Sequence, residues 1–373
     1  MRRVLVGGAA FAAACVSVAS VPGVAGAAPL PTPGSSLGPA SPPTLPSPPA
    51  PTDTESATGS PSQSPTGEAP TGETPSTGPS GPTRTPAGAP DADPSATVTG
   101  RAVMVTPKLP KSRTLAYGKD ARQRVDVYWQ PADPKDKKAK PRPGVLLLHG
   151  GYWLEGDKSG FKYFARRLTA QGFTVFAADY RLATTARWPA QRDDSLAALA
   201  YVRKHAKSFN LDPNRIAVLG SSAGGLLATQ VGALDEGAER VRGVVALSPV
   251  NTPYLAFQDG SGPTASPSQR KLRGAVTKLV GCVPAGPASS CWSRLDDANT
   301  AQHVSHGDAP MLLFHSSRDF VPVTQSTALA GAMRTAGVQA TVRTVPGTRH
   351  GMALMVDPTV YPTLLAWLKA RTA

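Results

Sequence analysis

Residues 216–229 read IAVLGSSAGGLLAT, and this short stretch decides the fold of the chain. An apolar run with the character of a strand leads into the pattern Gly-x-Ser-x-Gly at Gly220, and a helix-compatible run follows it. Small residues are needed around Ser222, because a strand that turns sharply into a helix brings backbone atoms too close for larger side chains. The pattern is typical of a nucleophile elbow, which lifts a serine hydroxyl clear of a sheet and places it at a helix N-terminus. We therefore expect Ser222 to be a nucleophile.

A second glycine-bearing turn, HGGYW at residues 149–153, follows the apolar run 144–148. Attack on a carbonyl group puts negative charge on its oxygen, so backbone N–H groups must point at that position in advance. Glycines allow this approach, and we expect an oxyanion hole made by the N–H groups of Gly150, Gly151 and Ala223. Tyr152 and Trp153 are expected to form an apolar wall of the substrate pocket.

A nucleophilic serine needs a base, and the base needs an acid to orient it. After an elbow of this kind the acid comes next in the chain and the histidine last. The strand-like run 311–315 leads into a loop that contains Asp319, and the alternating run 340–345 leads into a turn that ends at His350. We predict His350 as the base and Asp319 as the acid. The alternatives for the base are His306 and His315, whereas Asp296, Asp297 and Asp308 precede the strand whose end should carry the acid.

The order of the predicted elements favours an α/β fold, with a mostly parallel central sheet covered by helices on both faces. The expected strands are 125–129, 144–148, 174–178, 216–219, 243–247, 311–315 and 340–345, and the expected helices are 161–170, 193–206, 323–336 and 361–370. Groups that follow parallel strands meet at one edge of the sheet, which is where such sheets bind their ligands.

The chain from about Lys119 to Arg371 resembles the α/β-hydrolases, and most closely the esterases of the hormone-sensitive-lipase and bacterial feruloyl-esterase-like type. The matching motifs are HGGYW at 149–153, GDK at 156–158, DYRL at 179–182, DPNRI at 212–216, GSSAGG at 220–225, Asp319 and His350. One departure is Tyr152, which stands where many lipase-type relatives carry a third glycine. The resemblance implies a short cap insertion over the active site, within the long segment 251–307, from which Trp292 could reach the pocket.

The resemblance implies a serine carboxylesterase that acts on short-chain or aromatic acyl esters, either small molecules or esters linked to polysaccharide. Neither a cofactor nor a metal is expected, since side chains and water complete the chemistry. The HGGYW motif also resembles that of kynurenine formamidases, so an amidase with the same three residues is an alternative. A non-catalytic binding protein on a hydrolase scaffold is the third hypothesis, although such a protein does not need Ser222, Asp319 and His350.

Composition divides the chain into three parts. Residues 1–27 carry two arginines, an apolar stretch and a small-residue site, a pattern that predicts a cleaved signal peptide and a secreted protein. A retained membrane anchor, with the protein on the extracellular side, is the alternative. Residues 28–100 are rich in Pro, Ser, Thr and Gly and have almost no large apolar side chains, so a disordered linker is expected. Residues 101–373 are the predicted catalytic domain.

The predicted export of the protein determines how its cysteines are interpreted. Cys282 and Cys291 remain as a pair after the signal peptide is removed, and we expect a disulfide between them in an oxidising compartment. The two cysteines have no nearby histidines at zinc-like spacing, so a metal site is not expected.

The formal net charge of the 373 residues is +14. Residues 1–27 contribute +2 and residues 28–100 contribute −5, which leaves about +17 on the predicted catalytic domain. A domain of this charge is attracted to acidic surfaces, and an acidic polymer or the cell envelope is the candidate contact. Binding to nucleic acid is not supported, because no basic stretch with interleaved aromatic residues occurs.

Overall fold

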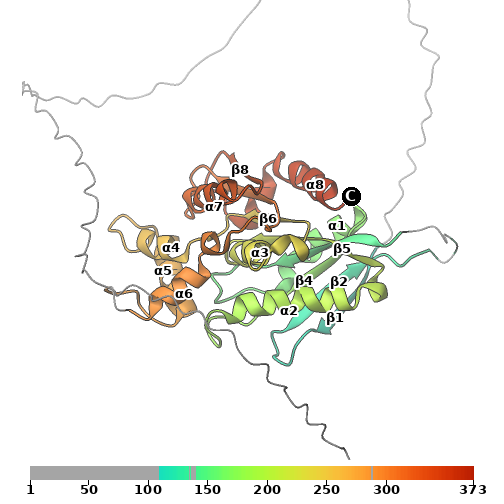
Figure 1. Ribbon diagram of the computed structural model, residues 1–373, viewed down its shortest axis with the longest axis horizontal. Helices are drawn as coiled ribbons and strands as arrows, with labels where there is room; N and C mark the ends of the chain where they lie inside the picture. Colours follow the sequence, from blue (N-terminus) through green and yellow to red (C-terminus); the bar gives the residue numbers. More distant parts are fainter. Residues whose placement is uncertain (1–108, 134, 136–139, 287–288) are drawn as a thin grey trace, which may run out of the picture. The chain divides into compact units, whose positions relative to one another are not determined.

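A computed structural model describes residues 109–133, 135, 140–286 and 289–373 (Figure 1). The predicted signal peptide and linker lie outside these residues. The described part of the chain forms an eight-stranded sheet in the order β1-β2-β4-β3-β5-β6-β7-β8. The strands are β1 (Lys111–Ala116), β2 (Arg124–Trp129), β3 (Arg142–Leu148), β4 (Thr174–Ala178), β5 (Leu211–Ser221), β6 (Gly243–Leu247), β7 (Met311–Ser316) and β8 (Ala340–Val345). This arrangement confirms the predicted fold class.

The sheet is parallel from β4 to β8, whereas β2 pairs antiparallel with both β1 and β4. Strand β1 was not predicted, because its sequence KSRTLA is mostly polar and almost every position is exposed. An edge strand of this kind has no buried face, so its sequence lacks the alternation that would reveal it.

Helices cover both faces of the sheet. The helices are α1 (Lys162–Ala170), α2 (Ala190–Lys204), α3 (Ala223–Ala233), α4 (Pro253–Asp259), α5 (Pro267–Val280), α6 (Cys291–Ala298), α7 (Thr324–Thr335) and α8 (Val360–Arg371), with short 3-10 helices η1 (Lys158–Phe161), η2 (Ala206–Phe209), η3 (Gly237–Glu239), η4 (Thr300–His303) and η5 (Gly351–Val356). Within the described residues, no helix is both long and apolar enough to cross a membrane.

Alternate side chains of the central strands enter two separate cores, as the period of a strand requires. Leu146 and Leu148 of β3 pack in a core with α2, α3 and α7, whereas Val145 and Leu147 pack in a second core with α1 and α8. Because both faces are buried, these strands read as continuous apolar runs in the sequence.

The turn from β5 into α3 is held close to the end of β3. A Cβ atom on Gly224 would lie only 2.2 Å from the carbonyl oxygen of Leu148, so a side chain cannot be accommodated there. This close approach brings the turn after β3 beside the first residues of α3. The two glycine-bearing motifs of the sequence therefore lie together at one edge of the sheet.

The predicted cap segment between β6 and β7 contains α4, α5 and α6, which lie together at one end of the domain in Figure 1 (yellow to orange). Helix α5 begins with a capping box, in which Ser266 accepts from the N–H of Gln269 and the side chain of Gln269 accepts from the N–H of Ser266. It ends at Gly281, whose φ of +73° is in the left-handed region. The sequence predicted an insertion here but not its helices.

Candidate active site

The structure brings Ser222, His350 and Asp319 into one hydrogen-bonded chain. The Oγ atom of Ser222 lies 2.7 Å from Nε2 of His350, and Nδ1 of His350 lies 2.8 Å from Oδ1 of Asp319. Because the carboxylate can only accept, Nδ1 donates to Asp319, which leaves Nε2 to accept from the Ser222 hydroxyl. These three residues come from the ends of β5, β7 and β8, as their positions in the sequence indicated.

Ser222 occupies a backbone conformation that L-residues rarely adopt, with φ of 55° and ψ of −117°. Its N–H donates to the carbonyl oxygen of Leu247 at the end of β6, at 2.8 Å, which holds the turn in place. Strained backbone of this kind persists only where the surrounding structure determines it, and it concentrates at functional sites.

Ser248 supports the predicted acid, Asp319, and this contact was not predicted from the sequence. Its hydroxyl donates to Oδ2 of Asp319 at 2.5 Å and accepts from the N–H of Gly351 at 2.9 Å. Asp319 also accepts from the N–H of Val321 at 3.1 Å, and its carboxylate is fully shielded from solvent. The signal in the sequence was a polar residue directly after the buried strand β6, beside the strand that carries Ser222.

Gly351 follows His350 and passes close to the elbow. Its φ is +58°, and a Cβ atom there would lie 2.6 Å from Oγ of Ser221. The position therefore requires glycine for both conformation and space. The hydrogen bond from Gly351 to Ser248 thus links the backbone after His350 to the residue that holds Asp319.

The predicted oxyanion hole lies beside Ser222. A Cβ atom on Gly150 would lie 3.2 Å from Cβ of Ser222, so the turn after β3 directly faces the serine. Neither the N–H of Gly150 nor that of Gly151 donates a hydrogen bond within the described residues. The N–H of Ala223 is in the first turn of α3, where helical N–H groups have no partner inside the helix. These three N–H groups are thus available to a ligand atom.

The structure corrects the prediction for Trp153. Its side chain is completely buried, and the indole Nε1 donates to the carbonyl oxygen of Ala223 at 3.1 Å. Its carbonyl oxygen accepts from the N–H of Ala183 at 2.7 Å. Trp153 therefore packs between the turn after β3 and the start of α3 and cannot line an open pocket. A single sequence does not distinguish a tryptophan that faces substrate from one that packs behind the site.

Tyr152 is only partly buried, and its φ of 58° lies in the left-handed region that a glycine would adopt without cost. Its ring stacks on Phe320 at 6.2 Å between centroids, and Phe320 packs on the ring of His350 at 4.2 Å. Contact between Tyr152 and substrate stays a prediction.

The cap contacts this aromatic pair through Lys271 of α5. The Lys271 ammonium lies 4.5 Å from the centroid of the Tyr152 ring and 2.7 Å from a carboxylate oxygen of Glu155. By contrast, Trp292 packs edge-on against Tyr254 at 4.7 Å and donates to the carbonyl oxygen of Gly286. Helix α5, more than Trp292, connects the cap to the turn after β3.

A pocket of about 420 Å³ adjoins the turn after β3. Its lining includes Gly150, Phe161 and Met352, which is two residues after His350. The pocket is open to solvent and lies between the predicted oxyanion hole and the backbone after the predicted base. Neither Ser222 nor His350 lines this pocket, so it adjoins the candidate site without containing it.

The alternative histidines take other roles. His306 is exposed on a loop, whereas His315 is completely buried beneath the loop that carries Asp319. Nδ1 of His315 donates to the carbonyl oxygen of Val321 at 3.2 Å, and Nε2 accepts from the hydroxyl of Ser326 at 2.7 Å. Burial lowers the pKa of His315 to about 4, because a charged imidazole loses its hydration there.

We expect the buried His315 to make the domain less stable in acid. In the unfolded chain this histidine binds its proton near pH 6.5, whereas in the folded chain it does so near pH 4, so the unfolded state binds more protons between these values. The free energy of unfolding should fall by about 2 to 3 kcal/mol from this group as pH drops from 7.5 to 4.5. Urea unfolding at the two pH values measures the loss, and His315→Gln should reduce it. An equal loss in the variant would show that other groups cause the acid sensitivity.

The sulfur atoms of Cys282 and Cys291 lie 2.00 Å apart, at bonding distance, in the loop between α5 and the start of α6. Within the described ranges, no three His, Cys, Asp or Glu side chains are placed together as metal ligands.

The fold and this edge of the sheet define the class of protein, which is an α/β-hydrolase. Among solved structures, the carboxylesterase EstE1 from a metagenomic library matches 72% of this chain and 92% of its own, with 25% identity and a TM-score of 0.56. The acetyl ester-xyloside bifunctional hydrolase of Caldicellulosiruptor lactoaceticus has the same fold, with 24% identity, a TM-score of 0.55 and coverage of 70% of this chain and 97% of that one.

Residues 126–333 match the BD-FAE family, which is more than half of the chain, and the chain belongs to this family. The matched region contains Ser222 and Asp319 and ends before His350. Esterase LipC of Mycobacterium tuberculosis is 31% identical over 265 residues, which cover 67% of this chain and 62% of LipC. The chain thus spans less than two thirds of the length of this curated relative.

Proposed function

We propose that this chain hydrolyses carboxylic esters through a covalent acyl-enzyme on Ser222. The observation that carries the proposal is the hydrogen-bonded chain from Ser222 Oγ through the imidazole of His350 to the buried carboxylate of Asp319. The esterase and carboxylesterase names of the related proteins LipC and EstE1 support it.

In the proposed reaction, His350 removes the hydroxyl proton as Ser222 attacks the ester carbonyl. The N–H groups of Gly150, Gly151 and Ala223 stabilise the negative oxygen of the tetrahedral intermediate. His350 then gives its proton to the leaving alcohol, and a water molecule releases the acid from Ser222 by the same steps. Asp319 holds the imidazole in the required tautomer and stabilises its positive charge.

The substrate proposed is a short-chain or aromatic acyl ester, free or attached to a polysaccharide. The rings of Tyr152 and Phe320 beside His350 offer an apolar surface for such a group. Two proteins of similar structure, an acetyl ester-xyloside bifunctional hydrolase and a carbohydrate esterase from gut microbiota, carry names that point to carbohydrate esters. An amide substrate uses the same groups, and no contact among the described residues distinguishes it from an ester.

We also propose that the protein acts outside the cell. The composition of residues 1–27 and the paired sulfur atoms of Cys282 and Cys291 support this location.

A fluorophosphonate probe tests the nucleophile and the location together. The oxygen of Ser222 should displace fluoride from phosphorus, and the added mass should appear on the peptide that contains residues 220–225. The probe is applied separately to culture medium and to cell lysate of the producing organism. A labelled protein in the medium supports export, whereas label on a different residue, or none on the folded protein, contradicts the proposed mechanism.

A further inference from the structure

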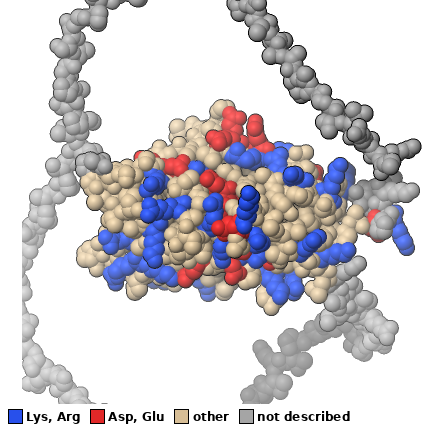
Figure 2. Space-filling model, turned by 90° about the horizontal axis from the view of Figure 1, so that it is seen from below, with Lys and Arg blue, Asp and Glu red and all other residues tan. Residues whose placement is uncertain are grey.

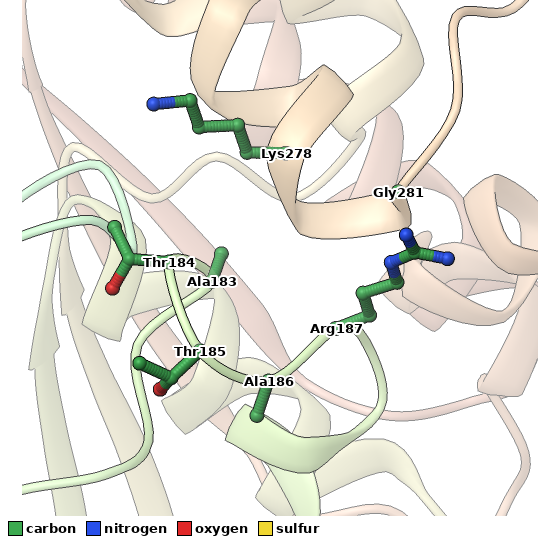
Figure 3. Close-up of a pocket in the computed structure, with 7 residues that line it drawn as sticks. All are labelled: Ala183, Thr184, Thr185, Ala186, Arg187, Lys278 and Gly281. Carbon is green, nitrogen blue, oxygen red and sulfur yellow. The ribbon is translucent and has the colours of Figure 1, made fainter.

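A second pocket lies on the cap side of the turn after β3. It has a volume of about 540 Å³ and is lined by loop residues 183–187 together with Lys278 and Gly281 at the end of α5. Figure 3 shows Arg187 extending from the loop toward Gly281, and Lys278 extending outward from α5 on the side of Thr184. The pocket is formed by two elements far apart in sequence, and the hydrogen bond from the N–H of Trp188 to the carbonyl oxygen of Leu279 holds them together at 2.8 Å.

The charge in this pocket has one sign. Arg187 and Lys278 are exposed, and neither forms an ion pair or a side-chain hydrogen bond within the described residues. The lining contains no Asp or Glu, and Figure 3 shows the hydroxyl oxygens of Thr184 and Thr185 turned away from Lys278 and Arg187. Other arginines nearby are already paired: Arg181 binds Asp194, and Arg192 binds Asp297. Two unpaired cations in a concave surface favour an anionic ligand.

Helix α5 connects this pocket to the candidate active site. Helix α5 carries four basic residues and no acidic residue. Lys278 follows Lys271 by two helical turns, so both lie on the same side of α5, about 10 Å apart along its axis. Lys271 contacts Tyr152, and the N–H of Ala183 in the pocket loop donates to the carbonyl oxygen of Trp153. The same side of α5 therefore faces both the turn after β3 and the second pocket.

The reacting ester group is uncharged and does not require these cations. We propose that the pocket of residues 183–187, Lys278 and Gly281 is a subsite for a carboxylate-bearing part of the substrate, which makes the natural substrate an ester of an acidic polysaccharide. The ester part of this inference rests on the proposed function, whereas the carboxylate part rests on the charges in the pocket. No aromatic side chain lines the pocket, so the bases of a nucleic acid would find no surface on which to stack.

The net positive charge of the protein does not by itself locate this site. Figure 2 shows basic side chains distributed over the whole visible face, with acidic side chains between them. A test must therefore separate the pocket from general attraction between a basic protein and an acidic polymer. A variant that loses two charges elsewhere serves as the matched control.

Fluorescence anisotropy of a labelled oligogalacturonate measures binding without any ester. The oligomer is titrated with the full chain at about 0.15 M salt, where attraction between charges more than about 8 Å apart is largely screened. The double variant Arg187→Gln/Lys278→Gln should bind about fivefold more weakly than the wild type, as expected for the loss of two exposed charge contacts. The control Lys162→Gln/Lys204→Gln removes the same charge from α1 and from the far end of α2, where both residues are exposed. It should bind within about twofold of the wild type, because salt weakens the attraction between the oligogalacturonate and charges far from the pocket.

Equal weakening in the two double variants, or none in either, would overturn the subsite. An equal fivefold loss for a labelled oligophosphate would overturn the assignment to a carboxylate. In a second arm, the pocket variant should lose activity on acetylated pectin and retain it on p-nitrophenyl acetate. Failure of the wild type to cleave either ester counts against the proposed function alone, because the anisotropy result does not depend on catalysis.

Discussion

Ser222→Ala is expected to lower the turnover of a short p-nitrophenyl ester by about six orders of magnitude. The hydroxyl of Ser222 lies 2.7 Å from Nε2 of His350, and its removal leaves the imidazole with no nucleophile to activate. The N–H groups beside it still bind the carbonyl oxygen, so a small rate above that of water should remain. Initial rates of p-nitrophenol release, with active-site titration of the wild type, measure the effect.

The neighbouring serine provides a matched control. The Oγ atom of Ser221 faces Gly351, so Ser221→Ala removes an equivalent hydroxyl one residue away and should keep turnover in the range of the wild type. His350→Ala should cost about as much as Ser222→Ala, and the double variant should cost no more than either, because the two residues act as a unit. Full activity in Ser222→Ala, or its loss in Ser221→Ala alone, would show that the nucleophile is misassigned.

Asp319→Ala should lower turnover by about four orders of magnitude, less than the loss of the serine. Without the carboxylate, Nδ1 of His350 loses its acceptor at 2.8 Å, and neither the tautomer nor the positive charge of the imidazole is stabilised. The change also leaves the hydroxyl of Ser248 and the N–H of Val321 without their acceptor. Activity is therefore measured beside circular dichroism and thermal unfolding, and Asp319→Asn provides a variant of the same shape.

Ser248→Ala separates the acid from its support. This change keeps the carboxylate but removes one hydrogen bond to it and the acceptor of the Gly351 N–H. A loss of roughly ten- to hundredfold is expected, as for one buried hydrogen bond. If Ser248→Ala and a folded Asp319→Ala lost activity equally, the charge of Asp319 would have no role of its own.

Much of the architecture was predictable because strands buried on both faces have a simple signature. Apolar runs at 174–178 and 243–247, and the alternating run 340–345, were predicted with the bounds that the structure shows. Local chemistry also marked the elbow, since only small residues fit at Gly220 and Gly224. Strand β1 was missed because an exposed edge strand leaves no alternating pattern. Helix α5 was also missed, although Leu272, Ala275, Val276 and Leu279 follow the spacing of an amphipathic helix and its capping box marks the start.

The sequence by itself determined the α/β-hydrolase fold and predicted the three side chains that the structure joins by hydrogen bonds. Motif order along the chain suffices for this, since parallel strands deliver their ends to one edge of the sheet. The tertiary structure alone decided that Ser248 holds Asp319, that Trp153 packs behind the site, and that Arg187 and Lys278 share a pocket. These relations join residues about 70 to 91 positions apart, and such contacts depend on packing and not on local pattern.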